Sequence, residues 1–224
     1  MTQSNSSILR SYIEEVTNQK HLDLLPKYFS ENFVGHGTPY VGMGVMTDDS
    51  SGVKVIIKVV YPGSPAEGKL MAGDEILRAF DGERTWKTFD ELRQGMWGQG
   101  ALGTSITLWV RREKIEHEIT LTRGLVQSFD FPYHLLEPSI SEFFKEWPDM
   151  KTLFVNVIES GDIVAYHAEN QGHNIRYGRS AVWAEFGFVR IKDGKITDWW
   201  STEDTFSQFK QLGYTIHEPA LVKE

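Results

Sequence analysis

The chain of 224 residues has no cysteine, which excludes disulfide bonds, thiolate metal ligands and a cysteine nucleophile. It has no apolar run of about 18 residues that could form a transmembrane helix. Its N-terminal residues 1–7 also lack the charged-then-apolar pattern of a secretory signal peptide. We therefore expect a cytoplasmic protein that has no membrane partner.

Basic side chains are outnumbered as well, with 23 Lys and Arg against 31 Asp and Glu and a net charge of −8. A chain of this charge repels a phosphate backbone, so we expect no nucleic-acid partner. Apolar residues make up 40% and aromatic residues 12% of the chain, which suffices for a packed core. These values predict a globular protein of one or two domains.

The C-terminal half has the pattern of an antiparallel sheet. Asp193-Gly194 is the strongest signal for a tight hairpin, because these residues accept the positive φ angles of a type I′ turn. Ser160-Gly161 marks a second hairpin. A sheet with so much aromatic surface needs helices on one face. The four predicted strands cover residues 152–158, 162–170, 181–191 and 196–202.

Helices for that face are predicted from the spacing of apolar residues around 8–16, 22–29 and 140–147, and residues 33–39 are expected to form a loop. The pattern between residues 40 and 123 is different. It predicts short strands over 41–46, 53–60, 75–80, 105–111 and 116–123, with a helix near 88–97. The sequence therefore predicts an α+β domain of residues 1–39 and 124–224, interrupted by a second domain of residues 40–123.

Residues 40–123 carry motifs at 41–45, 62–66, 70–77, 81–82 and 108–112 that resemble, in order, a PDZ domain of the bacterial protease-associated type. The resemblance implies that backbone amides bind the carboxylate of a partner's C-terminal peptide, which pairs with an exposed strand edge. We expect no protease domain of this family in the remaining residues. The residues that the resemblance assigns to peptide binding are Gly42, Met43, Gly44, Val45, Leu92 and Met96.

The flanking segments resemble the SnoaL-like polyketide cyclases, within the nuclear transport factor 2 fold group. The resemblance implies a cone-shaped curved antiparallel sheet over helices, with an apolar pocket, a small apolar ligand and a homodimer formed through the outer sheet face. We expect no metal and no other cofactor. The residues that carry it are 33–36, 147–150, 159–164, 171–173, 190–196, Trp199, Asp204 and 211–213.

This sequence departs from the family at the residues of the reaction. The SnoaL cyclases use an acidic residue, assisted by a histidine, in an intramolecular aldol closure. Counting from the turn at 193–196, the position of the acid falls on Ser201 and that of the histidine on Gly187. Neither residue moves a proton at neutral pH, so catalysis by the usual residues is in doubt.

Glu185 is the best remaining acid–base candidate. Strand alternation places it on the same face as Trp183, Trp199 and Ser201, among apolar neighbours that favour the uncharged form of a carboxyl group. An alternative interpretation, that Glu185 forms a structural ion pair with Arg176, Arg179 or Arg190, stays open.

His36 is the second catalytic candidate, because it matches a histidine at the pocket mouth of the family; the alternative is a solvent-exposed loop histidine. Asp204 is expected to cap a helix. His167 and Glu169 share a strand face, but no further ligand follows at diagnostic spacing, so we expect no metal site. The predicted ligand-pocket residues are Trp183, Trp199, Ser201, Tyr166 and His173.

Two functions remain open. The first is a cofactor-free proton-transfer enzyme of cyclase, isomerase or dehydratase type, which acts on an apolar carbonyl compound through Glu185 and His36. The second is a non-enzymatic adaptor or ligand-binding protein, which recruits partners through its PDZ domain.

Overall fold

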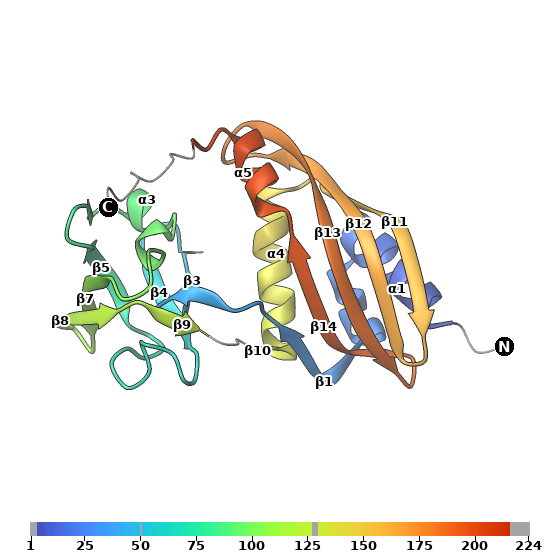
Figure 1. Cartoon of the computed structure of the whole chain (residues 1–224), viewed down its shortest axis with the longest axis horizontal. Coiled ribbons are helices and arrows are strands. Elements are labelled where there is room, and N and C mark those ends of the chain that lie inside the picture. The colour runs from blue at the N-terminus through green and yellow to red at the C-terminus, as the bar shows by residue number, and fades with distance from the viewer. Residues whose placement is uncertain (1–3, 50, 127–129, 216–224) are drawn as a thin grey trace, which may run out of the picture. The chain divides into compact units, whose positions relative to one another are not determined.

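The structure is a computed structural model that describes residues 4–49, 51–126 and 130–215 (Figure 1). The chain forms two compact units, one of Met1–His36 with Asp130–Glu224 and one of Gly37–Phe129. The predicted boundaries were 39/40 and 123/124. The second boundary lies later in the structure because β9 (Gly124–Val126) pairs with β2 (Tyr40–Gly42) inside the second unit.

The first unit is built on a six-stranded sheet in the order β10-β1-β14-β13-β12-β11. The four predicted strands are confirmed, each longer than predicted, and positive φ angles at Asp193 (51°) and Gly194 (76°) close the last hairpin. The strands are β1 (Phe29–His36), β10 (Asp130–Pro132), β11 (Lys151–Ser160), β12 (Ile163–Asn174), β13 (Arg179–Lys192) and β14 (Lys195–Glu203).

The loop predicted over residues 33–39 is wrong for its first half, because β1 continues to His36. This strand runs parallel to β14 and antiparallel to β10. Both partner strands come after the second unit in the sequence. A strand held by such distant partners has no local sequence signal.

Helices cover one face of this sheet, and Figure 1 shows α1 behind strands β11 to β13. The apolar stripe predicted for the first helix is confirmed, since Ile8, Leu9, Tyr12, Ile13 and Val16 are all buried. No helix in the described part of the chain is long and apolar enough to cross a membrane. The helices are α1 (Asn5–Tyr12), η1 (Ile13–Asn18), η2 (Leu22–Leu24), α2 (Leu25–Tyr28), η4 (Tyr133–Leu135), α4 (Leu136–Glu146) and α5 (Thr205–Leu212).

Local capping sets several helix ends. Ser4 caps α1, and its side chain accepts a hydrogen bond from the Ser7 amide. Asp204 caps α5 as predicted, accepting from the Ser207 amide at 2.9 Å. Gly213, with φ of 95°, ends α5 in the left-handed conformation typical of helix C-termini.

The helix-covered face carries two apolar clusters. The larger one includes Val189 and Ile191 of β13, together with the helices α1 and α2. The smaller one includes Trp183 of β13 with Trp147 and Leu212. The inward positions of β13 between the two clusters are Glu185 and Gly187, so a polar interval separates two apolar regions of one sheet face.

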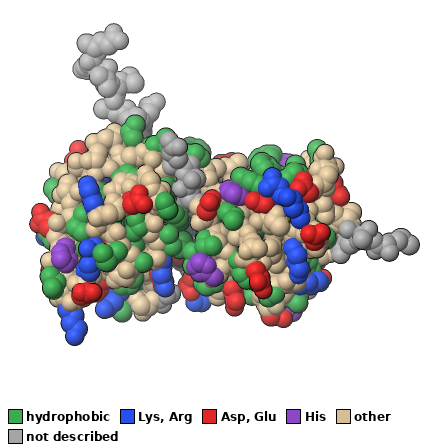
Figure 2. Space-filling view, turned by 90° about the horizontal axis from the view of Figure 1, so that it is seen from below, with side chains coloured by type: hydrophobic (Ala, Val, Ile, Leu, Met, Phe, Trp, Pro, Cys, Tyr) green, Lys and Arg blue, Asp and Glu red, His purple; other side chains and the backbone are tan. Residues whose placement is uncertain are grey.

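The opposite face of the sheet is partly exposed. Phe186 and Phe188 of β13 keep 51% and 42% of their surface accessible. Figure 2 shows that acidic, basic and hydrophobic side chains are interspersed on the face of the molecule in view. The two faces of this sheet therefore differ in what covers them.

The second unit has a six-stranded sheet with the order β3-β4-β5-β7-β8, in which β6 pairs with β5, and the two-stranded sheet of β2 and β9. Its core includes Met43, Leu92 and Trp97. The elements are β3 (Val45–Asp48), β4 (Val55–Val60), β5 (Glu75–Phe80), β6 (Thr85–Trp86), α3 (Phe89–Leu92), η3 (Met96–Gly98), β7 (Ser105–Arg112) and β8 (Ile115–Thr122).

Glycines shorten two predicted elements of this unit. The strand predicted over 41–46 is broken between β2 and β3, where Gly44 has φ of 78°. The helix predicted over 88–97 is the single turn α3, capped by Thr88 and Glu91, and Gly95 follows with φ of 70°.

Candidate functional site

The helix-covered face of β13 and β14 carries the predicted site. In the antiparallel register, Gly187 lies opposite Ser201 and Glu185 lies opposite Glu203. Alternation puts Trp199 on the same face. Glu185, Trp199 and Ser201 are partly exposed, so solvent reaches this part of the face.

Tyr166 of β12 fills the space beside Gly187. A Cβ atom added to Gly187 would lie 2.7 Å from the Tyr166 hydroxyl and 2.4 Å from the Trp200 carbonyl oxygen. The Trp199 indole donates a hydrogen bond to the same hydroxyl at 2.9 Å. Any side chain at position 187 is therefore excluded by its neighbours, and the glycine is required for packing.

Glu185 is held by two neutral hydrogen-bond donors. The Tyr166 hydroxyl donates to Oε1 at 2.5 Å and the Asn170 amide donates to Oε2 at 2.9 Å. Asn170 is in turn fixed by the Thr152 hydroxyl, which donates to its Oδ1 at 2.7 Å. Burial, followed by the charge of Glu185, raises the pKa of Tyr166, so the tyrosine remains a donor.

The predicted alternative of an ion pair at Glu185 is not what the structure contains. Arg176 lies 3.4 Å from Glu146, and Arg190 lies 3.1 Å from Asp198. The hydrogen-bond partners of Glu185 are a tyrosine and an amide. Its position is therefore set by neutral groups on the neighbouring strand.

Glu203 is the residue that sequence reasoning missed. The Trp183 indole donates to its Oε2 at 2.8 Å. Burial, and then the nearby charge of Glu185, raise the pKa of Glu203 to about 7, against the opposing effect of the Trp183 hydrogen bond. The residue is nevertheless exposed by accessible area, so this carboxyl is crowded by protein atoms yet open to solvent. The predicted strand ended at residue 202; continuing its alternation by one residue would have found Glu203.

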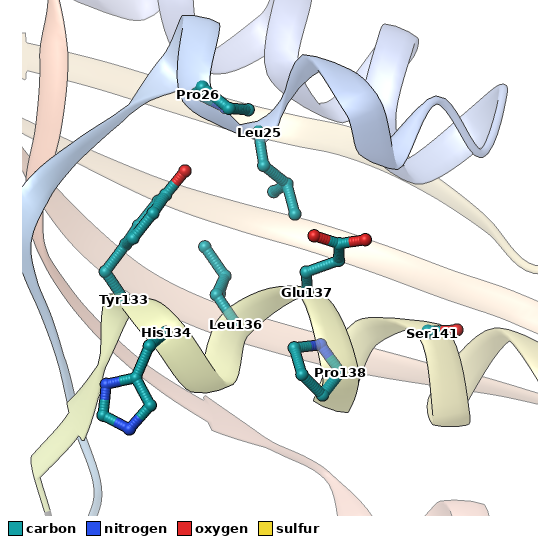
Figure 3. Close-up of a pocket in the computed structure, with 8 residues that line it drawn as sticks. All are labelled: Leu25, Pro26, Tyr133, His134, Leu136, Glu137, Pro138 and Ser141. Carbon is teal, nitrogen blue, oxygen red and sulfur yellow. The ribbon is translucent and has the colours of Figure 1, made fainter.

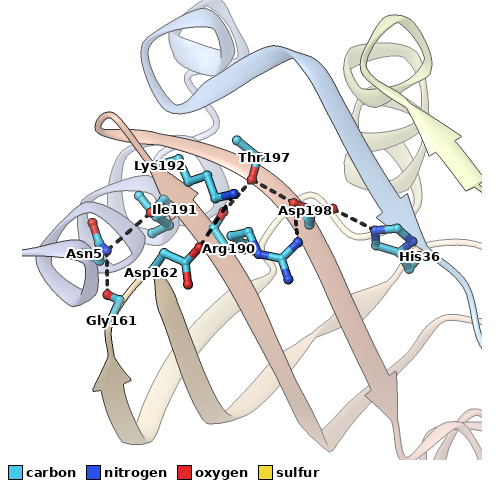
Figure 4. Close-up of polar contacts among 9 residues, drawn as sticks. All are labelled: Asn5, His36, Gly161, Asp162, Arg190, Ile191, Lys192, Thr197 and Asp198. Carbon is cyan, nitrogen blue, oxygen red and sulfur yellow. Dashed lines mark hydrogen bonds and ion pairs between the residues drawn. The ribbon is translucent and has the colours of Figure 1, made fainter.

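His36 lies on the other face of the sheet from Glu185. It is opposite Trp200, whose ring it stacks on at 4.3 Å, whereas Trp199 points inward. Its Nε2 lies 3.0 Å from Asp198 Oδ1 and its Nδ1 lies 3.3 Å from Asp130 Oδ1. Figure 4 shows His36 and Arg190 approaching Asp198 from different sides. His36 is paired with Trp200, and the side chains of Trp199 and Trp200 leave β14 on opposite faces. The expected cooperation of His36 with Glu185 is therefore wrong.

His173 also lies away from Glu185. It is paired with Ser180 across β12 and β13, and its Nδ1 lies 3.2 Å from the Ser180 hydroxyl. Its backbone amide donates to Asp149 at 2.7 Å. A hollow of about 240 Å³ adjoins these residues, lined by Asp149, Gln171, Gly172, Ser180, Ala181 and Val182. Of the two histidines predicted at the pocket, neither joins the carboxylates.

The other predicted pocket residues do come together. Tyr166 bonds to Glu185, Trp199 bonds to Tyr166, and Trp183 bonds to Glu203. Ser201 lies one inward position from Glu203 along β14. The site therefore holds two sets of side-chain hydrogen bonds on neighbouring strands, one around Glu185 and one between Trp183 and Glu203.

A separate hollow of about 400 Å³ lies between α2 and α4 and was not predicted (Figure 3). Tyr133 and Glu137 extend toward Leu25 across it in the close-up. None of the residues that line it belongs to the hydrogen-bond chain around Glu185. The lining residues are Leu25, Pro26, Tyr133, His134, Leu136, Glu137, Pro138 and Ser141.

The predicted peptide loop of the second unit is shaped by close packing. A Cβ atom on Gly44 would lie 2.1 Å from the Ser64 Cβ, and one on Gly42 would lie 2.7 Å from the Tyr40 ring. The Met43 side chain is buried in the core, and its carbonyl accepts from the Ala66 amide at 3.0 Å. The two glycines therefore let this loop approach its neighbours.

The edge of the second unit's sheet follows that loop. Val45 begins β3, which is the terminal strand in the sheet order. Leu92, predicted as a pocket wall, is 3% exposed and packs in the core. The side chain of Met96, the other predicted wall, lies outside the described part of the structure.

Comparison with known proteins bears on the first unit. Residues 137–212 match the family model described as SnoaL-like polyketide cyclase. No curated protein matches the chain. Among solved structures, a SnoaL-like polyketide cyclase from Agrobacterium tumefaciens is 12% identical with a TM-score of 0.49, and the alignment covers 95% of this chain and 100% of that one. IdmH from Streptomyces antibioticus is 15% identical with a TM-score of 0.45, covering 95% of this chain and 100% of that one.

The matched segment runs from the first turn of α4 to the end of α5 and contains all four long strands. It confirms the SnoaL-like, nuclear transport factor 2-like fold that the sequence predicts for the first unit. The segment includes Glu185 and Glu203, and it leaves out residues 37–129.

Proposed function

We propose that the first unit binds a small, largely apolar carbonyl compound and that Glu185 moves a proton on it, in a reaction of cyclase, isomerase or dehydratase type. The observation that supports this is the carboxylate of Glu185, fixed by Tyr166 and Asn170 on the helix-covered face of a SnoaL-like fold. A carboxylate acts as a general base when its position is set before the substrate binds.

The surroundings of Glu185 suit such a ligand. Apolar clusters lie on either side of it along β13, around Trp183 and around Val189. The side chains of these clusters are buried, so the surface left for a substrate is that of the partly exposed Glu185, Trp199 and Ser201. Removing a proton from the carbon next to a carbonyl group needs a base at that carbon and a proton donor at the carbonyl oxygen. In proteins, positioned side chains take both roles.

The test is solvent deuterium exchange into 2-tetralone, an apolar ketone with acidic protons next to its carbonyl group, followed by proton NMR. We expect Glu185→Gln to lower the protein-dependent rate by about 100-fold or more. Glu169→Gln is the matched control, because Glu169 is exposed on the outward face of the neighbouring strand β12. Equal rates for wild type and Glu185→Gln would remove Glu185 from the reaction.

The second unit supports a second candidate function, the binding of a peptide C-terminus. The supporting observation is the edge strand β3 directly after the Gly42–Gly44 loop. An extended peptide pairs with such an edge, and its carboxylate meets backbone amides. Peptides selected from a library with free C-termini would be compared with their C-terminal amides. We expect the amides to bind at least about tenfold more weakly, and indifference to the free carboxylate would count against a PDZ function.

A homodimer through the outward face of the sheet is the partner proposal for the first unit. Phe186 and Phe188 give this face exposed aromatic surface. Sedimentation velocity would test it: we expect a dimer for the wild type and a monomer for the double substitution Phe186→Lys with Phe188→Lys. A monomeric wild type at all concentrations would refute the proposal.

A further inference from the structure

We propose that Glu203 is the second catalytic residue of this site and donates a proton to the substrate's carbonyl oxygen while Glu185 removes a proton from carbon. This rests on the proposed function of Glu185. The assignment adds a residue that neither the sequence pattern nor the SnoaL resemblance identifies.

The first argument is the register of β13 and β14. Glu185 and Glu203 are directly opposite in the antiparallel pair and on the same face. Side chains in such pairs have Cβ atoms about 4.5–5.5 Å apart. Like charges directly opposite each other destabilise a strand pair, which favours a proton on one of the two carboxyl groups.

The hydrogen bonds decide which carboxyl keeps the proton. Glu185 accepts from a donor at each oxygen, Tyr166 at one and Asn170 at the other, which is the arrangement of a carboxylate. For Glu203, the described residues supply one donor, Trp183, at Oε2. Burial raises the pKa of Glu203 to about 7. Glu203 is thus the acid and Glu185 the base of the pair.

The second argument is the blocked position next to this pair. Gly187 and Ser201 are opposite each other one inward position away along the same two strands. The resemblance places the cyclases' histidine and acid at these two positions. Here Tyr166 fills the space in front of Gly187. Glu185 lies two residues before Gly187 in β13, and Glu203 lies two residues after Ser201 in β14. At these positions the inward face still reaches solvent. The acid–base pair of this site is therefore two residues away, on both strands, from the positions that the cyclases use.

The resulting step is an enolisation with a complete balance. The Glu203 O–H bond breaks and its proton forms an O–H bond at the carbonyl oxygen. The C–H bond beside the carbonyl breaks, its proton goes to Glu185, and its electron pair becomes the carbon–carbon double bond of the enol. Glu185 ends neutral and Glu203 ends charged, so the net charge of the pair is unchanged. Glu185 then gives its proton to another carbon, or to the oxygen of a second carbonyl group that the enol carbon attacks. The enol O–H proton returns to Glu203 as the first carbonyl group re-forms, which restores the starting state of both residues.

The test compares Glu203→Gln, Glu185→Gln and Glu169→Gln in the 2-tetralone exchange assay, with the protein-free rate subtracted. Glutamine keeps the volume of the side chain and an oxygen to accept from Trp183, and circular dichroism would check that the variant is folded. We expect Glu203→Gln to lower kcat by about 100-fold with KM changed by less than about threefold. Glu169→Gln should match the wild type.

The pH profile is the second readout. Glu203 is faced by the Glu185 carboxylate and the Trp183 indole from β13, and Glu185 is faced by the Tyr166 hydroxyl from β12. The wild-type rate should fall as pH rises through about 7, as Glu203 loses its proton, and this fall should be absent in Glu203→Gln. An active wild type with an equally active Glu203→Gln overturns the inference and leaves the proposed function standing. An inactive wild type overturns both.

Discussion

The two faces of the first unit's sheet carry the same kinds of side chain in opposite electrostatic settings. On the outward face, Asp198 meets the Arg190 guanidinium and the ring of His36. On the inward face, the hydrogen-bond donors that Glu185 and Glu203 meet among the described residues are neutral. Strand alternation, more than composition, therefore decides which acid meets a charged partner and which meets neutral donors.

The pKa directions follow this division. Burial alone would raise the pKa of Asp198, but hydrogen bonds from His36, Thr197 and Arg190 lower it below its usual value. Burial and a neighbouring carboxylate raise the pKa of Glu203 to about 7. A charged partner favours the ionised form and a buried neutral one does not. The outward acid is therefore held ionised, and the inward acid can hold a proton.

The largest expected effect comes from a side chain at position 187, in the space that Tyr166 occupies on the inward face. Gly187→Ala puts a Cβ atom 2.4 Å from a backbone carbonyl, so the strand or Tyr166 must move. We expect a loss of about 1–3 kcal/mol in the free energy of unfolding, measured by urea denaturation. Thr202→Ala on the outward face, which is exposed, is the control and should change it by less than about 0.5 kcal/mol. A fully stable Gly187→Ala would show that the inward face is loosely packed.

His36 gives a test of the outward face. His36→Ala removes the ring that contacts Asp198, Asp130 and Trp200. Because these groups are partly exposed, we expect a loss of about 1 kcal/mol in unfolding free energy. The exchange rate with 2-tetralone should stay within about threefold of the wild type, since His36 does not reach Glu185. A loss of exchange as large as that of Glu185→Gln would contradict the assignment of the two faces.

Sequence reasoning reached most of the inward face because hairpin and alternation signals are local. The four long strands, the Asp193-Gly194 turn and the inward direction of Glu185 all follow from short patterns. The strand β1 did not follow, because its partners β10 and β14 are distant in sequence. That one error placed His36 in a loop, where its direction was undetermined, instead of on the outward face.

Glu203 was missed for a different reason. The predicted last strand stopped at Thr202, one residue short of the position opposite Glu185. Strand ends are set by the pairing partner and the following cap, here Asp204 of α5, and carry little signal of their own. The raised pKa of Glu203 also depends on burial by residues that only the fold brings near.

A further expected effect is the opposite pH dependence of stability on the two faces. The folded-state pKa of Glu203 is raised from 4.5 to about 7, so the folded state binds more protons in that window. Its contribution to stability is present below about pH 4.5 and is lost as pH rises toward 7. The folded-state pKa of Asp198 is lowered from 3.8, so its contribution is present above that value and is lost as pH falls further.

Urea denaturation of Glu203→Gln and Asp198→Asn at a series of pH values would measure both slopes. Relative to the wild type, Glu203→Gln should gain stability between pH 4.5 and 7, and Asp198→Asn should lose least at the most acidic pH. Slopes of the same sign for the two variants would mean that both acids share one environment, and the assignment of Glu203 as the proton donor would lose its electrostatic basis. Opposite slopes would support the assignment of Glu203 as the proton donor. They would show that Asp198 and Glu203, which leave β14 on opposite faces, lie in different electrostatic environments.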